Sequence, residues 1–164
     1  MNTADGAPAS HAIDPELDLQ LQRVVDVSPA AVWAAWTTPE HLMRWFTPAP
    51  WMTTACEIDL RPGGRFQTTM RSPEGAEHVN DGCYLEVVPL RRLVFTDALL
   101  PGYRPAPNPF MVGIIELEPW EGGTRYTATA KHVDRETRDK HEAMGFHHGW
   151  GTALDQLVAF VKGT

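Results

Sequence analysis

Cysteine is scarce in this 164-residue chain. Cys56 and Cys83 are its two cysteines, and they do not form a C-x-x-C motif. A disulfide framework needs more cysteines than this in a domain of this size, so we expect free thiols in a reducing cytoplasm. The glycines on either side of Trp150 lack the spacing and the preceding strand of a phosphate-binding loop. We therefore expect no cofactor.

Positive charge is scarce as well. The chain has 14 Lys and Arg against 21 Asp and Glu, which gives a formal net charge of -7 at pH 7. A surface that binds phosphates needs a basic excess, so this balance excludes a general nucleic-acid binder. Long apolar runs are missing too. Because no stretch of about 18 apolar residues exists, we expect no membrane span.

The N-terminus lacks the basic start and the apolar segment of a signal peptide. Its small, polar and proline-containing sequence predicts a disordered lead-in over residues 1–14. The remaining residues, 15–164, are enough for a single domain with one core.

That domain begins with a predicted strand and two short helices. Apolar and mostly polar residues alternate over residues 17–27, which indicates a half-buried strand. Ser28 followed by Pro29 is typical of a helix start. We predict one helix over residues 29–38 and a second over residues 40–45.

The middle of the chain changes to a period of two. Turn sequences rich in glycine and proline separate the alternating segments, so neighbouring strands should pair as antiparallel hairpins. The predicted strands are residues 54–60, 65–71, 77–88, 93–99, 111–118 and 124–132. Four prolines within residues 100–109 exclude a central strand there and predict a loop.

A long helix is predicted over residues 135–162, with Asp134 as its N-cap. It would be roughly 40 Å long. Its apolar stripe consists of Ala143, His147, Trp150, Leu154, Leu157 or Val158, and Val161. Glycines at 145, 149 and 151 interrupt this helix, and each costs about 1 kcal/mol relative to alanine. Close approach of the backbone to a neighbour or ligand would explain them, and a local bend is the alternative.

Together these elements predict an α+β fold. It has an antiparallel sheet of about seven strands, two short helices after the first strand and a long C-terminal helix. One helix cannot cover both faces of such a sheet, so we expect the sheet to curve around the helix and to leave its other face to water. Strong curvature would leave a cavity beside the helix, with the loops 47–51 and 100–109 at its mouth.

Four segments carry a resemblance to a known family. They are V-D-V-S-P-A-A-V-W-A-A-W-T-T-P-E-H-L-M-R-W-F-T-P (25–48), R-P-G-G-R-F (61–66), G-C-Y-L-E-V-V-P-L-R-R-L-V-F-T (82–96) and H-E-A-M-G-F-H-H-G-W-G-T-A-L-D-Q-L (141–157). In this order they are similar to the family of the activator of heat-shock protein 90 ATPase, within the START-like (SRPBCC) superfamily. The resemblance covers about residues 17–161 and implies a helix-grip fold with a deep hydrophobic pocket.

The resemblance implies several functions. Superfamily members include lipid and hormone carriers, polyketide cyclases and aromatases, and chaperone-activating domains. The chaperone activator itself has an additional N-terminal domain, for which this chain has no room. We expect binding of a small hydrophobic or aromatic ligand, such as a lipid or a polyketide-like molecule. The alternatives are an enzyme of cyclase, dehydratase or hydrolase type and a stress-related chaperone-interaction module. A homodimer is compatible with each of them.

Bulky apolar side chains are the candidate walls of the cavity. They are Trp45, Phe46, Trp51, Phe66, Met70, Tyr84, Phe95, Phe110, Met111, Met144, Phe146 and Trp150. Some of them will pack the core instead. The methionines would suit a pocket that adapts to varied shapes.

Three polar residues are candidates for chemistry in the same cavity. His147 lies on the apolar stripe of the predicted helix, as a cavity residue or a hydrogen-bonded core histidine. Asp97 and Glu86 occupy the same alternating positions of their predicted strands as neighbours that are expected to face inward. Asp97 would lie on the rim instead if its strand ends near Thr96. A few polar groups among apolar walls are typical of small-molecule sites. No arrangement of nucleophile, base and orienting residue is readable, so we favour binding over catalysis.

A zinc site is not expected on the last helix. His141-Glu142 would need a second histidine at position 145 to form H-E-x-x-H, and that position is Gly145. His141 and His148 are two helical turns apart, too far to share one metal easily. We therefore expect no metal.

Overall fold

The computed structural model describes residues 12–163. Most of the predicted lead-in, residues 1–14, therefore lies outside the described residues. At its end, the carbonyl oxygen of Asp14 accepts hydrogen bonds from the backbone N–H groups of Leu17 and Asp18, at 3.0 and 2.8 Å. This turn leads directly into the first strand.

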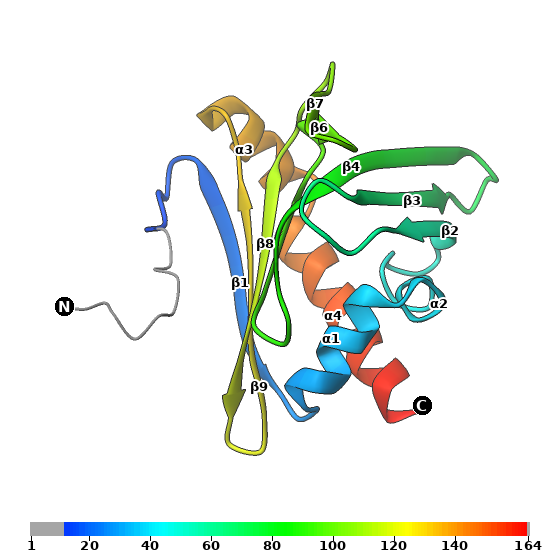
Figure 1. The fold of residues 1–164 in the computed structure, drawn as a ribbon, viewed down its shortest axis with the longest axis vertical. Coiled ribbons are helices and arrows are strands. Elements are labelled where there is room, and N and C mark those ends of the chain that lie inside the picture. The colour runs from blue at the N-terminus through cyan, green and yellow to red at the C-terminus, as the bar shows by residue number, and fades with distance from the viewer. Residues whose placement is uncertain (1–11, 164) are drawn as a thin grey trace.

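Seven strands form one antiparallel sheet in the order β1-β9-β8-β5-β4-β3-β2. They are β1 (Asp18–Val25), β2 (Met52–Ile58), β3 (Arg65–Arg71), β4 (Glu77–Val88), β5 (Arg92–Thr96), β8 (Val112–Trp120) and β9 (Gly123–Lys131). The sheet is strongly curved, with β1, β8 and β9 on one side of the helices and β2, β3 and β4 on the other (Figure 1). The predicted curved antiparallel sheet is confirmed.

Two short helices follow β1, as predicted. They are α1 (Pro29–Thr37) and α2 (Pro39–Leu42). The side chain of Ser28 caps α1, because its hydroxyl oxygen accepts a hydrogen bond from the N–H of Ala31 at 3.1 Å. Both short helices lie with the C-terminal helix inside the concave face of the sheet (Figure 1).

The prediction of a single long helix over residues 135–162 is wrong. The chain forms α3 (Arg135–Ala143) and α4 (Phe146–Lys162), separated by Met144 and Gly145. Gly145 has a φ of 94°, a left-handed conformation that favours glycine and ends α3. The bend, and not close backbone approach, therefore explains Gly145.

Close approach does not explain Gly149 either. No heavy atom of the described residues beyond its own helix turn lies within 4 Å of the position that a Cβ would take there. Gly149 instead faces open space.

The proline-rich segment also differs from the prediction. Residues 100–109 were expected to be a loop, but β6 (Leu99–Leu100) and β7 (Arg104–Pro105) form a separate two-stranded ribbon. A proline is tolerated there because β7 is exposed, is only two residues long and needs few backbone donors. The strand predicted over residues 93–99 ends earlier, since β5 stops at Thr96.

The hydrophobic core lies between the concave face of the sheet and the helices α1 and α4. Leu93, Ile115 and Ala128 come from the sheet, and Val32 and Leu157 come from the helices; all five are almost fully buried. Within residues 12–163, no helix is both long and apolar enough to cross a membrane.

Candidate functional site

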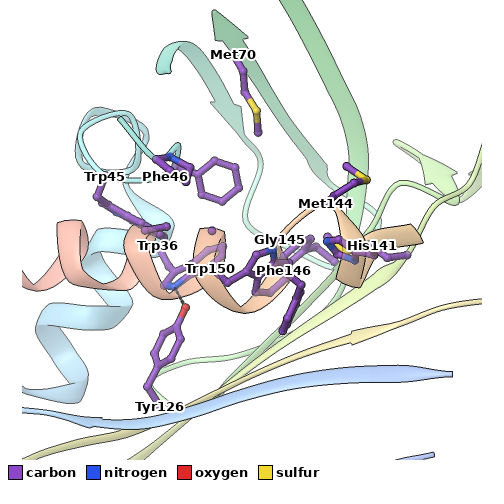
Figure 2. A pocket seen from close by; sticks show the side chains of 15 residues that line it. Trp36, Trp45, Phe46, Met70, Tyr126, His141, Met144, Gly145, Phe146 and Trp150 are labelled. Carbon is purple, nitrogen blue, oxygen red and sulfur yellow. Dashed lines mark hydrogen bonds between the residues drawn. The ribbon is translucent and has the colours of Figure 1, made fainter. Parts of the chain in front are cut away.

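A cavity of about 280 Å³ continues from this core toward the break between α3 and α4 (Figure 2). Residues from the sheet, from α1, from the segment after α2 and from α3 and α4 line it. They are Trp36, Trp45, Phe46, Pro48, Met70, Phe95, Met111, Tyr126, His141, Met144, Gly145, Phe146, Gly149, Trp150 and Ala153. Apolar side chains dominate this set, as in most small-molecule sites.

One end of the cavity, here called the aromatic end, is formed by Trp36, Trp45, Phe46 and Phe95. The ring centroid of Trp36 lies 5.0 Å from that of Trp45, 5.6 Å from that of Phe46 and 5.7 Å from that of Phe95. These separations and the largely edge-to-face geometries are favourable for aromatic pairs. The rings form one continuous hydrophobic wall.

The polar atoms at the aromatic end are paired within the protein. The indole N–H of Trp36 donates to the hydroxyl oxygen of Tyr126 at 3.1 Å, and that of Trp45 donates to the carbonyl oxygen of Ala35 at 3.0 Å. Burial raises the pKa of Tyr126, so its hydroxyl stays protonated. This end presents no charge to the cavity.

The other end, here called the histidine end, contains His141 of α3, close to Phe146 and Trp150. Figure 2 shows His141 and Met144 on the side away from Trp36 and Trp45. The ring centroid of His141 lies 5.2 Å from that of Phe146 and 6.0 Å from that of Trp150. Burial, and then the neighbouring His132, lowers the pKa of His141 to about 4. His141 is therefore neutral at neutral pH.

A short hydrogen-bonded chain positions His141. Its Nδ1 lies 2.9 Å from Nε2 of His132, and Nδ1 of His132 lies 2.7 Å from the carbonyl oxygen of Leu17. Leu17 immediately precedes β1 and His132 immediately follows β9, so the adjoining ends of these two paired strands hold this chain of hydrogen bonds, here called the relay. The relay fixes the orientation of the His141 ring.

Most of the expected wall residues lie at the cavity. Those in its lining are Trp45, Phe46, Met70, Phe95, Met111, Met144, Phe146 and Trp150. Phe66 and Tyr84 instead stack on each other in the core, with ring centroids 5.2 Å apart. Trp51 lies on the surface against His78, and Phe110 packs on the ring of His141 without lining the cavity.

The three polar candidates do not meet in the cavity. His147 is exposed, so the expected interior position is wrong. The break at Gly145 starts α4 with Phe146 facing inward, and the next residue then points to solvent. The buried side of α4 follows Phe146, Ala153, Leu154 and Leu157.

Glu86 and Asp97 also point elsewhere. A β-bulge between Tyr84 and Glu86 shifts the alternation of β4 by one residue. Glu86 therefore lies on the outer face, 2.9 Å from Nε of Arg92. Asp97 follows the end of β5, and its Oδ1 accepts hydrogen bonds from the backbone N–H groups of Phe110 and Met111, at 2.9 and 3.1 Å.

Sequence reasoning missed several lining residues. They are Trp36, Pro48, Tyr126, His141, Gly145, Gly149 and Ala153. An alternating signal was available for Tyr126, because Tyr126, Ala128 and Ala130 are all buried on one face of β9. No comparable signal existed for His141, whose inward position depends on where α3 ends.

The arrangement can enclose a neutral, largely aromatic body. No Asp, Glu, Lys or Arg is among the lining residues. Within the described part of the chain, no group of three or more His, Cys, Asp or Glu side chains could hold a metal ion.

Solved structures of similar proteins share this fold. A protein from Nitrosomonas europaea is 50% identical, with a TM-score of 0.90 over 92% of this chain and 97% of that chain. A protein from Rhodobacter sphaeroides is 24% identical, with a TM-score of 0.78 over 90% of this chain and 93% of its own. An AHSA1-like protein from Aeromonas hydrophila is 23% identical, with a TM-score of 0.69 over 90% and 93%.

No protein of curated function matches the sequence. The family model described as "Activator of Hsp90 ATPase homolog 1-like protein" matches residues 26–162. This match covers most of the chain, and its fold is the START-like (SRPBCC) fold described above, which commonly binds ligands. The chain therefore belongs to the family of proteins similar to the activator of Hsp90 ATPase homolog 1.

Proposed function

We propose that this protein binds a small, neutral and largely aromatic molecule in the cavity between the sheet and α4. The observation that carries the proposal is the lining itself. Seven Phe, Trp and Tyr side chains surround the space, and no Asp, Glu, Lys or Arg is among the lining residues. Aromatic rings offer a ligand large apolar contact and favourable edge-to-face geometry.

The absence of lining charges favours an uncharged ligand. A carboxylate or ammonium group would lose its hydration on entering and would find no opposite charge among the lining residues. His141 does not supply one, because its pKa is lowered to about 4. Recognition then depends on shape, apolar contact and single hydrogen bonds.

The size of the cavity favours a compact ligand. Its volume of about 280 Å³ lies at the small end of the roughly 300–1,000 Å³ that ligand pockets usually have. One or two fused rings fit this space better than a lipid with two long chains. Met70, Met111 and Met144 lie in the wall, and their flexible side chains can adapt to ligands of different outline.

We place this binding in the cytoplasm. Cys56 and Cys83 are both free thiols, which suits a reducing compartment. Burial raises the pKa of Cys56 to about 11, so its thiol remains protonated and unreactive. A homodimer stays a prediction.

The catalytic alternative has less support. It depended on His147, Asp97 and Glu86 converging on the cavity, and each of them has another position or partner. His141 is the one imidazole in the lining, and the hydroxyl of Tyr126 accepts a hydrogen bond from Trp36 at the aromatic end. A single base with no nucleophile beside it suits binding better than acid–base chemistry.

Native mass spectrometry of freshly purified protein tests the proposal. We expect a bound aromatic compound in the wild type and its loss in Gly149→Leu, because the new side chain would occupy the cavity. His148→Leu is the matched control, since the exposed His148 is one residue away and does not line the cavity. A wild-type protein that neither carries such a compound nor takes up added 2-naphthol or naphthalene would contradict the proposal.

A further inference from the structure

The relay at the histidine end determines which nitrogen of His132 carries a proton. Nδ1 of His132 lies 2.7 Å from the carbonyl oxygen of Leu17. A carbonyl oxygen only accepts hydrogen bonds, so Nδ1 must be the donor. In the neutral ring, Nε2 of His132 is then unprotonated and accepts.

The same reasoning about donors and acceptors applies to His141. Its Nδ1 lies 2.9 Å from the unprotonated Nε2 of His132, so Nδ1 of His141 carries the proton and donates. A neutral imidazole has one N–H group, and Nε2 of His141 is therefore left with a free lone pair. The peptide carbonyl of Leu17 thus defines the tautomer of a residue in the cavity wall.

No side chain or backbone group of the described residues donates to this free lone pair. Among residues 12–163, the hydrogen bond of Nδ1 to His132 is the single one that the side chain of His141 makes. The side chain is only 7% exposed, and its remaining neighbours are the rings of Phe110, Phe146 and Trp150. Nε2 of His141 is not among the fully buried side-chain atoms that lack a partner, so it is accessible from the cavity that His141 lines, and a ligand that donates to it gains binding free energy.

We propose that the ligand is a hydroxylated aromatic molecule, a phenol in the simplest case, whose O–H group donates a hydrogen bond to Nε2 of His141. This inference rests on the proposed function and adds the chemical class. A phenol combines the apolar ring that the aromatic end accepts with a neutral donor for the histidine end. An ether or ketone offers no donor, and an ionised carboxylate would place its own lone pairs against that of Nε2.

The affinities of two matched probes at pH 7.5 test the inference. The NMR shifts of the indole N–H groups report the binding of each probe. We expect 2-naphthol to bind about 5- to 10-fold more tightly than 2-methoxynaphthalene, which has the same rings without the donor. His141→Phe should remove this preference, because the affinity for 2-naphthol should fall to that for 2-methoxynaphthalene. The exposed His148→Phe is the control and should retain the preference.

A second measurement does not depend on a variant that folds. The ¹⁵N shifts of the wild-type imidazoles should show an unprotonated Nε2 in ligand-free His141. On addition of 2-naphthol this shift should move toward that of a hydrogen-bonded nitrogen, and 2-methoxynaphthalene should leave it in place.

The outcomes separate the two proposals. Equal binding of both probes, or a protonated Nε2 in the ligand-free protein, would overturn the hydroxyl inference and leave the aromatic cavity intact. Binding of neither probe to the wild type would overturn the proposed function and the inference with it.

Discussion

At the aromatic end of the cavity, Trp36 and Trp45 are 4% and 2% exposed and both indole N–H groups are hydrogen-bonded within the protein. At the histidine end, His141 is nearly as buried, yet one of its ring nitrogens has no partner among the described residues, and the helix beside it is broken at Gly145. Satisfied polar atoms are what a stable core requires. Nε2 of His141 is not one of the fully buried unpaired atoms, so a ligand in the cavity can reach it, which makes the histidine end the part suited to recognition.

Trp45→Ala should give the largest effect, because the aromatic end is part of the core. The variant removes a ring that is 2% exposed and leaves the carbonyl oxygen of Ala35 without its donor. We expect a loss of about 3–5 kcal/mol in the free energy of unfolding, measured by urea denaturation. Trp51→Ala is the control, since Trp51 is 39% exposed. A loss below 1 kcal/mol for Trp45→Ala would remove the distinction between the two ends.

The histidine end should make stability depend on pH. The pKa of His141 is about 4 in the folded protein, against an ordinary value of 6.5 in the unfolded chain. Below pH 6.5 the unfolded chain binds a proton that the folded protein does not, so stability falls as the pH drops toward about 4 and then levels off. Over this window the contribution amounts to about 3 kcal/mol.

Urea denaturation at several pH values checks this, with His141→Phe as the comparison. The wild type should lose more stability than the variant between pH 7 and pH 4, while His148→Phe should follow the wild type. Identical pH profiles for the wild type and His141→Phe would show that His141 is not held neutral by the fold.

Two glycines at the histidine end should respond oppositely to the same substitution. Gly145→Ala places a side chain on a residue with a φ of 94°, which should cost roughly 1–2 kcal/mol. Gly149→Ala adds a methyl group where no heavy atom beyond its own helix turn lies within 4 Å, and should stabilise α4 by about 0.5–1 kcal/mol. Thermal unfolding of both variants measures the sign. A stabilising Gly145→Ala would contradict the bend.

Much of the fold follows from local sequence patterns. The alternation of period two predicts the strands because their inward residues are buried in one core, as for Phe66 and Thr68 on β3. The Ser28-Pro29 pair predicts the start of α1, and the hydroxyl of Ser28 does cap it. These signals act within a few residues, so they do not depend on the rest of the fold.

The cavity is harder to predict, because its lining depends on irregularities of one residue. The bulge in β4 turns Glu86 outward. The break at Gly145 puts Phe146, and not His147, on the inner side of α4. His141 pairs with His132 only because β9 and α3 are brought together by the intervening turn. A pattern averaged over several residues does not register such single-residue shifts.

His147→Ala should have the smallest effect and tests this orientation of α4 directly. His147 adjoins the inward-facing Phe146 in sequence but is exposed and does not line the cavity. We expect the free energy of unfolding to change by less than about 0.5 kcal/mol, as for most exposed positions. The affinity for 2-naphthol should stay within twofold of the wild type in an NMR titration. His147→Ala could instead weaken binding as strongly as His141→Phe. In that case α4 would have the orientation of a continuous helix, and His147, not His141, would be the histidine at the cavity.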